Sequence, residues 1–242
     1  VYAHVIGFGA DRGLELPDGD PWRLSVQVLD FLRMPLFVAI SGFVYAAMAP
    51  PPGAWRMFSK RKLIQLGVPL AFATFVFWLM RGVMNGEFDD IVRAYTWGYQ
   101  HLWFLGSLLM LLLMAAAIDS VFKAPQAVWW GILLVAAFTA HLTPDIQVLH
   151  LRNTATLVPF FALGVLMQRR PALFTSRAML AGAAVLSAYI FGLQAYNLAN
   201  GRWPYEGIWI LGIPLTAGVI LLLLNVVGRV PWLAFIAIYS FT

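Results

Sequence analysis

The chain has 242 residues, of which 61% are hydrophobic and only 11% charged, and its mean hydropathy is +0.78. A soluble domain carries roughly a quarter charged residues, and a soluble core of this size cannot hide so many apolar side chains. The composition excludes a soluble globular protein and predicts an all-α, polytopic transmembrane helical bundle whose solvent is the lipid bilayer.

Two function classes are disfavoured at this point. The net charge of +5 would suggest nucleic acid in a soluble protein, but the positive bias of membrane-protein loops explains it here, so we expect no nucleic-acid partner. The chain has no cysteine, which excludes a disulfide framework and a thiolate metal site, and we expect no bound metal.

Apolar segments of about 20 residues are long enough to cross a bilayer as helices. Two of the candidates, 127–140 and 154–168, are shorter. We expect that they either tilt, cross a thin region of the bilayer or form a re-entrant pair. The apolar stretches 1–8 and 230–242 look like truncated first and last helices, so the complete bundle would hold about ten helices. No internal repeat or soluble linker interrupts the chain, and we expect a single transmembrane domain over 1–242. The seven expected spans are 26–49, 63–80, 102–118, 127–140, 154–168, 178–199 and 208–228.

Lysine and arginine set the orientation of the spans, because cytoplasmic loops carry an excess of both. Four basic residues lie in the loop 50–62, and all three lysines of the chain fall on its side. Nine of the eleven acidic residues fall in the loops of the opposite side. We therefore expect the loops 50–62, 119–126, 169–177 and 228–230 to be cytoplasmic.

Four ionisable residues lie within or beside the predicted spans, where such groups are costly and usually functional. His4 lies in the truncated first helix, Asp30 and Arg33 share one face of the next, and His101 begins the helix at 102–118. All four belong to the outer half of the predicted bundle. Simpler roles are also open: Asp30 and Arg33 neutralise each other, His101 caps a helix, and His4 packs as a neutral core residue.

Such a cluster is suited to acid–base chemistry on a hydroxyl group. A neutral histidine accepts the proton as the hydroxyl attacks. A carboxylate orients the histidine, and a cation stabilises a developing oxyanion.

Several motifs resemble one known family. The stretch FLRMPLFVAISGF at 31–43 is similar to the F-x-x-MPLFF-x-x-SGF signature of the acyltransferase 3 family, which consists of integral membrane O-acyltransferases of cell-surface carbohydrates. HLWFL at 101–105 matches a second motif of that family, and His4 stands where the family has its first-helix histidine. Weaker similarities occur in KRKLIQLGVP at 60–69, PFFALG at 159–164 and AIYSFT at 237–242.

The resemblance implies a donor site on the cytoplasmic side. An acyl-CoA, usually acetyl-CoA, would present its acyl group there, with Arg61 and Lys62 near its phosphates, where cationic side chains are suitable. The small residues Ser41 and Gly42 would allow close helix packing or close approach of the donor.

The resemblance also implies the catalytic roles and the location. His4 would act as general base or carry the acyl group, with His101, Asp30 and Arg33 in support, and Trp103 would contact the substrate. The acceptor would be a carbohydrate hydroxyl at the outer face of a bacterial inner membrane. Two rivals stay open: a secondary transporter or flippase for a sugar-like or anionic solute, and a non-catalytic membrane scaffold. A transporter usually shows repeat symmetry, which is not visible in this sequence.

Overall fold

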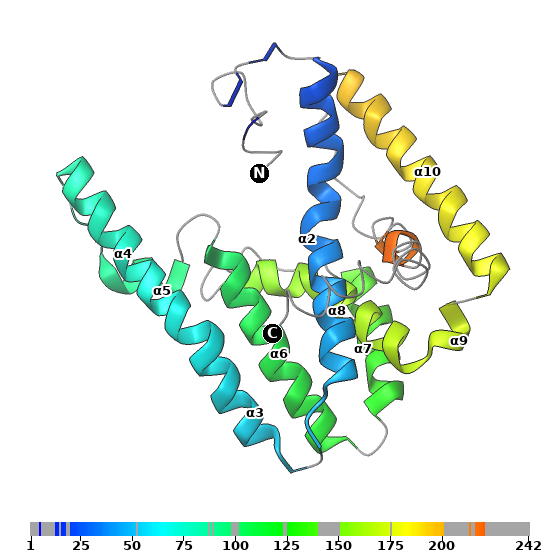
Figure 1. The fold of residues 1–242 in the computed structure, drawn as a ribbon, viewed down its shortest axis with the longest axis horizontal. Coiled ribbons are helices and arrows are strands. Elements are labelled where there is room, and N and C mark those ends of the chain that lie inside the picture. Colours follow the sequence, from blue (N-terminus) through cyan, green and yellow to red (C-terminus); the bar gives the residue numbers. More distant parts are fainter. Residues whose placement is uncertain are drawn as a thin grey trace, which may run out of the picture. The chain divides into compact units, whose positions relative to one another are not determined.

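The structure, a computed structural model, is helical, with no strand in the part of the chain that it describes (Figure 1). Two compact units divide the chain: residues 1–40 with 170–242, and residues 41–169. The all-α fold class is confirmed. The described residues are 5, 13–14, 16–17, 20–51, 53–86, 88, 90–97, 102–122, 125–139, 151–174, 176–200, 213 and 216–220.

Every span expected between 26 and 199 is helical over its described residues, except that the first ends at Ala47 and not at 49. Of the segment 208–228 the structure describes 213 and 216–220, which are helical, and the expected terminal helices lie outside the described residues except Val5. The elements are α2 (Pro21–Ala47), α3 (Trp55–Lys62), the π-helical turn η1 (Leu63–Gly67), α4 (Val68–Asn85), α5 (Ile91–Trp97), α6 (Leu102–Val121), α7 (Pro125–Thr139), α8 (Leu151–Arg169), α9 (Pro171–Phe174) and α10 (Arg177–Ala199).

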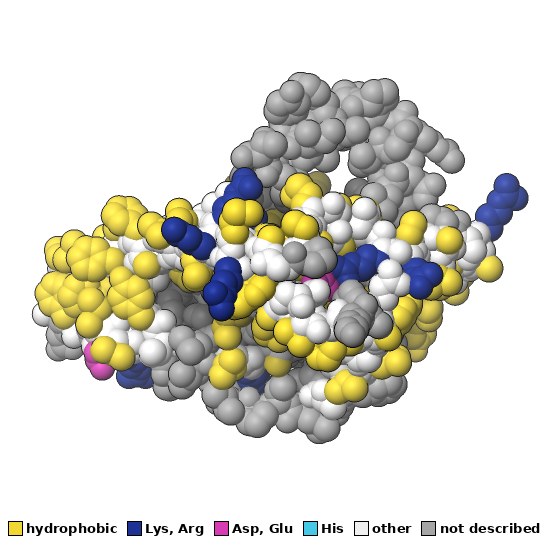
Figure 2. Space-filling view, turned by 90° about the horizontal axis from the view of Figure 1, so that it is seen from below, with side chains coloured by type: hydrophobic (Ala, Val, Ile, Leu, Met, Phe, Trp, Pro, Cys, Tyr) yellow, Lys and Arg dark blue, Asp and Glu magenta, His cyan; other side chains and the backbone are white. Residues whose placement is uncertain are grey.

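Within the part of the chain that the structure describes, four helical stretches are long and apolar enough to cross a membrane: Pro21–Ala47, Trp55–Asn85, Leu102–Val121 and Arg177–Leu198. In the second stretch only 6% of the most apolar window is buried within the protein. Phe72, Val83 and Met84 on α4 are 68%, 70% and 79% exposed, and Figure 2 shows apolar side chains crowded along this helix. A large exposed apolar surface of this kind is typical of a helix that faces lipid or another apolar partner.

The prediction that 50–62 is a loop was wrong in its extent, because the helix begins at Trp55. Gly53, with φ at 85°, makes the turn before it, in a backbone conformation that disfavours side chains. No proline or glycine interrupts 55–66, so the basic residues continue the helix. The π-helical turn then precedes Pro69, whose ring lacks an N–H donor and crowds the preceding turn.

The core of the unit 41–169 is built around α8. Nine consecutive residues of α8, from Pro159 to Met167, are buried, and the helix packs against α6 and α7. A helix that is apolar on all sides is typically enclosed by other helices. The close approach of α2 at Gly42 fits this packing, because a side-chain carbon there would collide with the Phe161 backbone carbonyl.

The other unit contains the first part of α2, α10 and the helical segment 216–220. Its buried cluster joins Leu32 of α2 to Ile190 of α10, with Val219 packed against them. Gly218 lies against α10, where a side-chain carbon would be 2.9 Å from the Ser187 hydroxyl oxygen.

Candidate functional site

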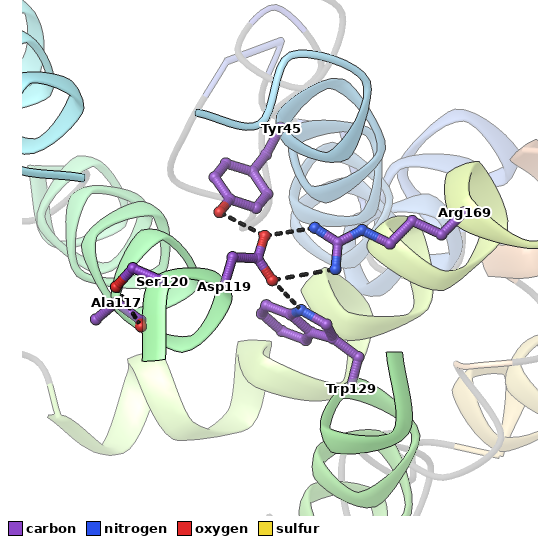
Figure 3. A network of polar contacts seen from close by, with 6 residues as sticks. All are labelled: Tyr45, Ala117, Asp119, Ser120, Trp129 and Arg169. Atoms are coloured by element: carbon purple, nitrogen blue, oxygen red, sulfur yellow. Dashed lines mark hydrogen bonds and ion pairs between the residues drawn. The ribbon is translucent and has the colours of Figure 1, made fainter. Parts of the chain in front are cut away.

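A network of four side chains joins the ends of four helices in the unit 41–169 (Figure 3). The Asp119 carboxylate, near the end of α6, lies at its centre. It accepts hydrogen bonds from the Tyr45 hydroxyl at 2.8 Å and from the Trp129 indole N–H at 3.0 Å. The Arg169 guanidinium binds both carboxylate oxygens, with a distance of 3.1 Å from Nη1 to Oδ1. We call these residues the Asp119 network.

The Asp119 network is well shielded from solvent. The Asp119 side chain is 9% exposed and that of Arg169 is 14% exposed. A shielded carboxylate needs a counter-charge and hydrogen bonds to its oxygens. Here each of the two oxygens accepts two hydrogen bonds. Asp119 therefore serves to tie helix ends together, and it is poorly suited to abstract a proton.

Aromatic contacts extend the network in two directions. The ring of Tyr45 lies edge-on to that of Phe58 on α3, with centroids 5.8 Å apart, and Lys62 Nζ lies 5.6 Å from the centroid of the Phe58 ring. On the other side, the rings of Tyr45 and Trp129 both contact Phe161 of α8. The last turn of α3 is thus connected to the buried carboxylate through two aromatic rings.

Helix α3 carries a concentration of positive charge, with Lys60, Arg61 and Lys62 in its last turn and Arg56 near its start. Arg56, Lys60 and Arg61 are exposed and Lys62 is half-buried. None of these four forms an ion pair with a described residue: Arg56 stacks on Trp55, and Lys62 donates to Gln65 Oε1 at 3.2 Å. Figure 2 shows Lys and Arg side chains on the face that it views. We call Lys60, Arg61 and Lys62 the basic end of α3; their charge is available to a soluble anion.

Two of the residues expected at the donor, Arg61 and Lys62, belong to this basic end. The third, Ser41, is half-buried and precedes Gly42, which packs against the backbone of α8. The structure therefore gives Gly42 a packing role. The roles in donor binding expected for Arg61, Lys62 and Ser41 stay predictions.

The expected catalytic residues are only partly described. His4 and His101 lie outside the described residues. Asp30 and Arg33 lie on α2 as expected; Arg33 is exposed, whereas the side chain of Asp30 is outside the description. Trp103 is half-buried on α6, edge-on to Phe104 with a centroid distance of 5.9 Å. The convergence of the catalytic residues on one cavity, and their roles, stay predictions.

Sequence analysis missed the Asp119 network. It treated Asp119 only as the end of a span and Arg169 as part of a basic loop. A usable signal was present, since an acidic residue stands at a helix end on the side predicted to be rich in basic residues. Opposite charges at helix ends on the same membrane side are candidates for pairing.

Comparisons with known proteins show which family the chain belongs to. The model of a protein family described as an acyltransferase domain matches residues 1–242, which is the whole chain. No curated protein and no solved structure matches it. The match agrees with the motifs at 31–43 and 101–105 and with the helices that are long and apolar enough to cross a membrane. The chain therefore belongs to the acyltransferase 3 family of membrane-bound O-acyltransferases.

Proposed function

We propose that this acyltransferase moves an acyl group, such as acetyl, from cytoplasmic acyl-CoA to a hydroxyl of a cell-surface or periplasmic carbohydrate. Its location would be the bacterial inner membrane. The family match supports acyl transfer in general. The observation that carries the choice of donor is the basic end of α3, whose three cations form no ion pair with a described residue and lie on the predicted cytoplasmic side.

Coenzyme A is a polyanion with several phosphate groups, and Lys and Arg side chains are the usual partners of such groups. Arg61 and Lys62 are the proposed phosphate ligands. Lys62 is held against the Phe58 ring, and that ring lies on Tyr45 of the Asp119 network. The buried network thereby fixes the helix from which the phosphate-binding cations project, which lowers the entropy lost on binding.

The proposed reaction is a balanced acyl transfer. The acceptor hydroxyl oxygen attacks the thioester carbonyl, a carbon–oxygen bond forms and the carbon–sulfur bond breaks. His4 takes the hydroxyl proton, and the departing CoA thiolate gains a proton to leave as the thiol. Asp30, Arg33 and His101 would support His4, and Trp103 would contact the acceptor.

A genetic experiment tests the overall proposal. The gene is deleted and reintroduced as wild type, His4→Ala or His150→Ala, and ester-linked acyl groups on surface glycans are quantified by mass spectrometry. His150 is a matched control, because sequence analysis gives it no catalytic role. We expect the ester signal to vanish on deletion, to return with wild type and His150→Ala, and to stay absent with His4→Ala. An ester content that is the same in all strains would refute the proposal and favour solute transport.

The donor site has its own test. Replacing Arg61 and Lys62 together by Gln should raise the KM for acyl-CoA by at least about tenfold, since even one lost phosphate contact is worth about 1.5 kcal/mol. The wild-type KM should also rise with ionic strength. The control replaces Arg81 and Arg93, two exposed arginines on the predicted opposite side, by Gln. An equal rise in KM for both double variants would mean that net charge alone matters and that α3 is not the donor site.

A further inference from the structure

The buried face of α10 carries polar side chains that have no hydrogen-bond partner. Gln194 is completely buried, and neither its amide oxygen nor its amide nitrogen makes a hydrogen bond within the described part of the chain. The hydroxyls of Ser187 and Thr216 likewise make no hydrogen bond within the described part of the chain, and Thr216 is completely buried. All three belong to the unit formed by residues 1–40 and 170–242.

Ser187 and Gln194 lie on one stripe of α10. They are seven residues apart, and Ile190, also completely buried, lies between them on the same helix face. Leu32 of α2 and Val219 pack at Ile190, and Gly218 lies against Ser187. The stripe therefore faces the interior of its unit, whereas Tyr189 and Tyr196 on the outer face of the helix are 60% and 63% exposed.

An unpartnered amide is costly in such a place. Burying an amide without a hydrogen bond costs roughly 1–3 kcal/mol or more, and most buried side-chain polar atoms in proteins have a partner. Methionine has nearly the same length and would avoid this cost. The presence of glutamine at position 194 is therefore explained by a partner that lies outside the described residues.

Gln194 lies near the predicted outer end of α10. It is five positions before Ala199, the last residue of the helix, which places it about 8 Å from that end at the helical rise. The loop that follows, 199–207, is predicted to face outward. The proposed function places the carbohydrate acceptor on this side. An amide offers both a donor and an acceptor, and each sugar hydroxyl likewise donates and accepts.

We propose that Gln194 is an acceptor-binding residue that hydrogen-bonds a hydroxyl of the carbohydrate, with the neighbouring Ser187 hydroxyl as a second contact. This inference rests on the proposed function. Gln194 takes no part in proton transfer or in donor binding. Its loss should weaken the binding of the acceptor and leave the binding of the donor unchanged.

The test compares Gln194→Met with wild type and with Tyr196→Phe, a control that removes an exposed hydroxyl from the same helix. The probe is the glycan that loses esters in the deletion strain, stripped of esters by mild alkali. Three quantities are measured on the purified full chain: thiol release from acyl-CoA without glycan, the KM for the glycan, and Tm with and without glycan. For Gln194→Met we expect unchanged thiol release, a KM raised roughly tenfold and a higher Tm without glycan. Glycan should raise the Tm of wild type and Tyr196→Phe but not that of Gln194→Met.

The outcomes separate the two proposals. No thiol release and no glycan esterification by wild type would overturn the proposed function itself. Active wild type with an unchanged glycan KM and an unchanged glycan-induced Tm shift in Gln194→Met would overturn the acceptor role alone. A Gln194→Met chain that does not fold, or has a lower Tm without glycan, would also overturn it, because Gln194 would then have a structural partner.

Discussion

Asp119 is the residue whose replacement tests the observed packing most directly. In Asp119→Ala, the Tyr45 hydroxyl and the Trp129 indole lose their acceptor, and the guanidinium of Arg169 is left without its counter-charge. Since the two charged side chains are only 9% and 14% exposed, water cannot fully replace the lost partner. Breaking a buried ion pair from one side costs about 3–5 kcal/mol, and we expect a loss of unfolding free energy in that range.

A double-mutant cycle isolates the ion pair from the rest of the network. Arg169→Met keeps an apolar stem but leaves the carboxylate with only two neutral hydrogen-bond donors. We therefore expect the free energy of unfolding to fall by about 2–4 kcal/mol. The double variant removes both charges together and leaves no orphan ion. Its loss should be smaller than the sum of the single losses by about 2 kcal/mol.

Equilibrium unfolding in mixed detergent micelles, followed by circular dichroism in the far ultraviolet, measures these free energies. Ser120→Ala is the control, because the Ser120 hydroxyl bonds only the Ala117 carbonyl on the exposed side of the same helix end (Figure 3). That change should stay within about 0.5 kcal/mol of wild type. Losses for Asp119 and Arg169 that add within about 0.5 kcal/mol would refute the reasoning, because they would show that the two charges do not interact.

Further predictions concern packing and the lipid-facing surface. Gly42→Ala should destabilise the protein by about 1–3 kcal/mol in the same unfolding assay, because the new methyl group meets the rigid Phe161 carbonyl. Gly131→Ala, on α7 with open space around it, should be neutral or stabilising, and equal losses for both would contradict the close approach at Gly42. Phe72→Lys should lower the membrane-inserted fraction, at a cost of about 2.5–3.5 kcal/mol if the residue lies near the bilayer centre, whereas Phe72→Leu should not. Normal insertion of Phe72→Lys, measured by carbonate extraction, would place α4 away from lipid.

The local sequence was sufficient to predict the helices and to indicate the family. A span of apolar residues in lipid must satisfy its own backbone hydrogen bonds, so the runs 102–118 and 178–199 had to be helical whatever they contact. The motifs at 31–43 and 101–105 are likewise contiguous in the chain, and they indicated the acyltransferase 3 family that the whole-chain match confirmed. The start of α3 at Trp55 was missed, because a basic run is equally compatible with a loop and with an exposed helix.

Tertiary structure alone decided which side chains meet. Tyr45 and Asp119 are 74 residues apart in the chain, and Asp119 and Arg169 are 50 apart, so no local pattern links them. Their contact depends on how α2, α6 and α8 pack, and that packing is set by the fit of small residues such as Gly42 to a neighbouring backbone. The burial of Gln194 is of the same kind: the sequence placed it on a spanning helix, but only the packing of α2 and 216–220 against α10 decided that its amide faces inward without a partner.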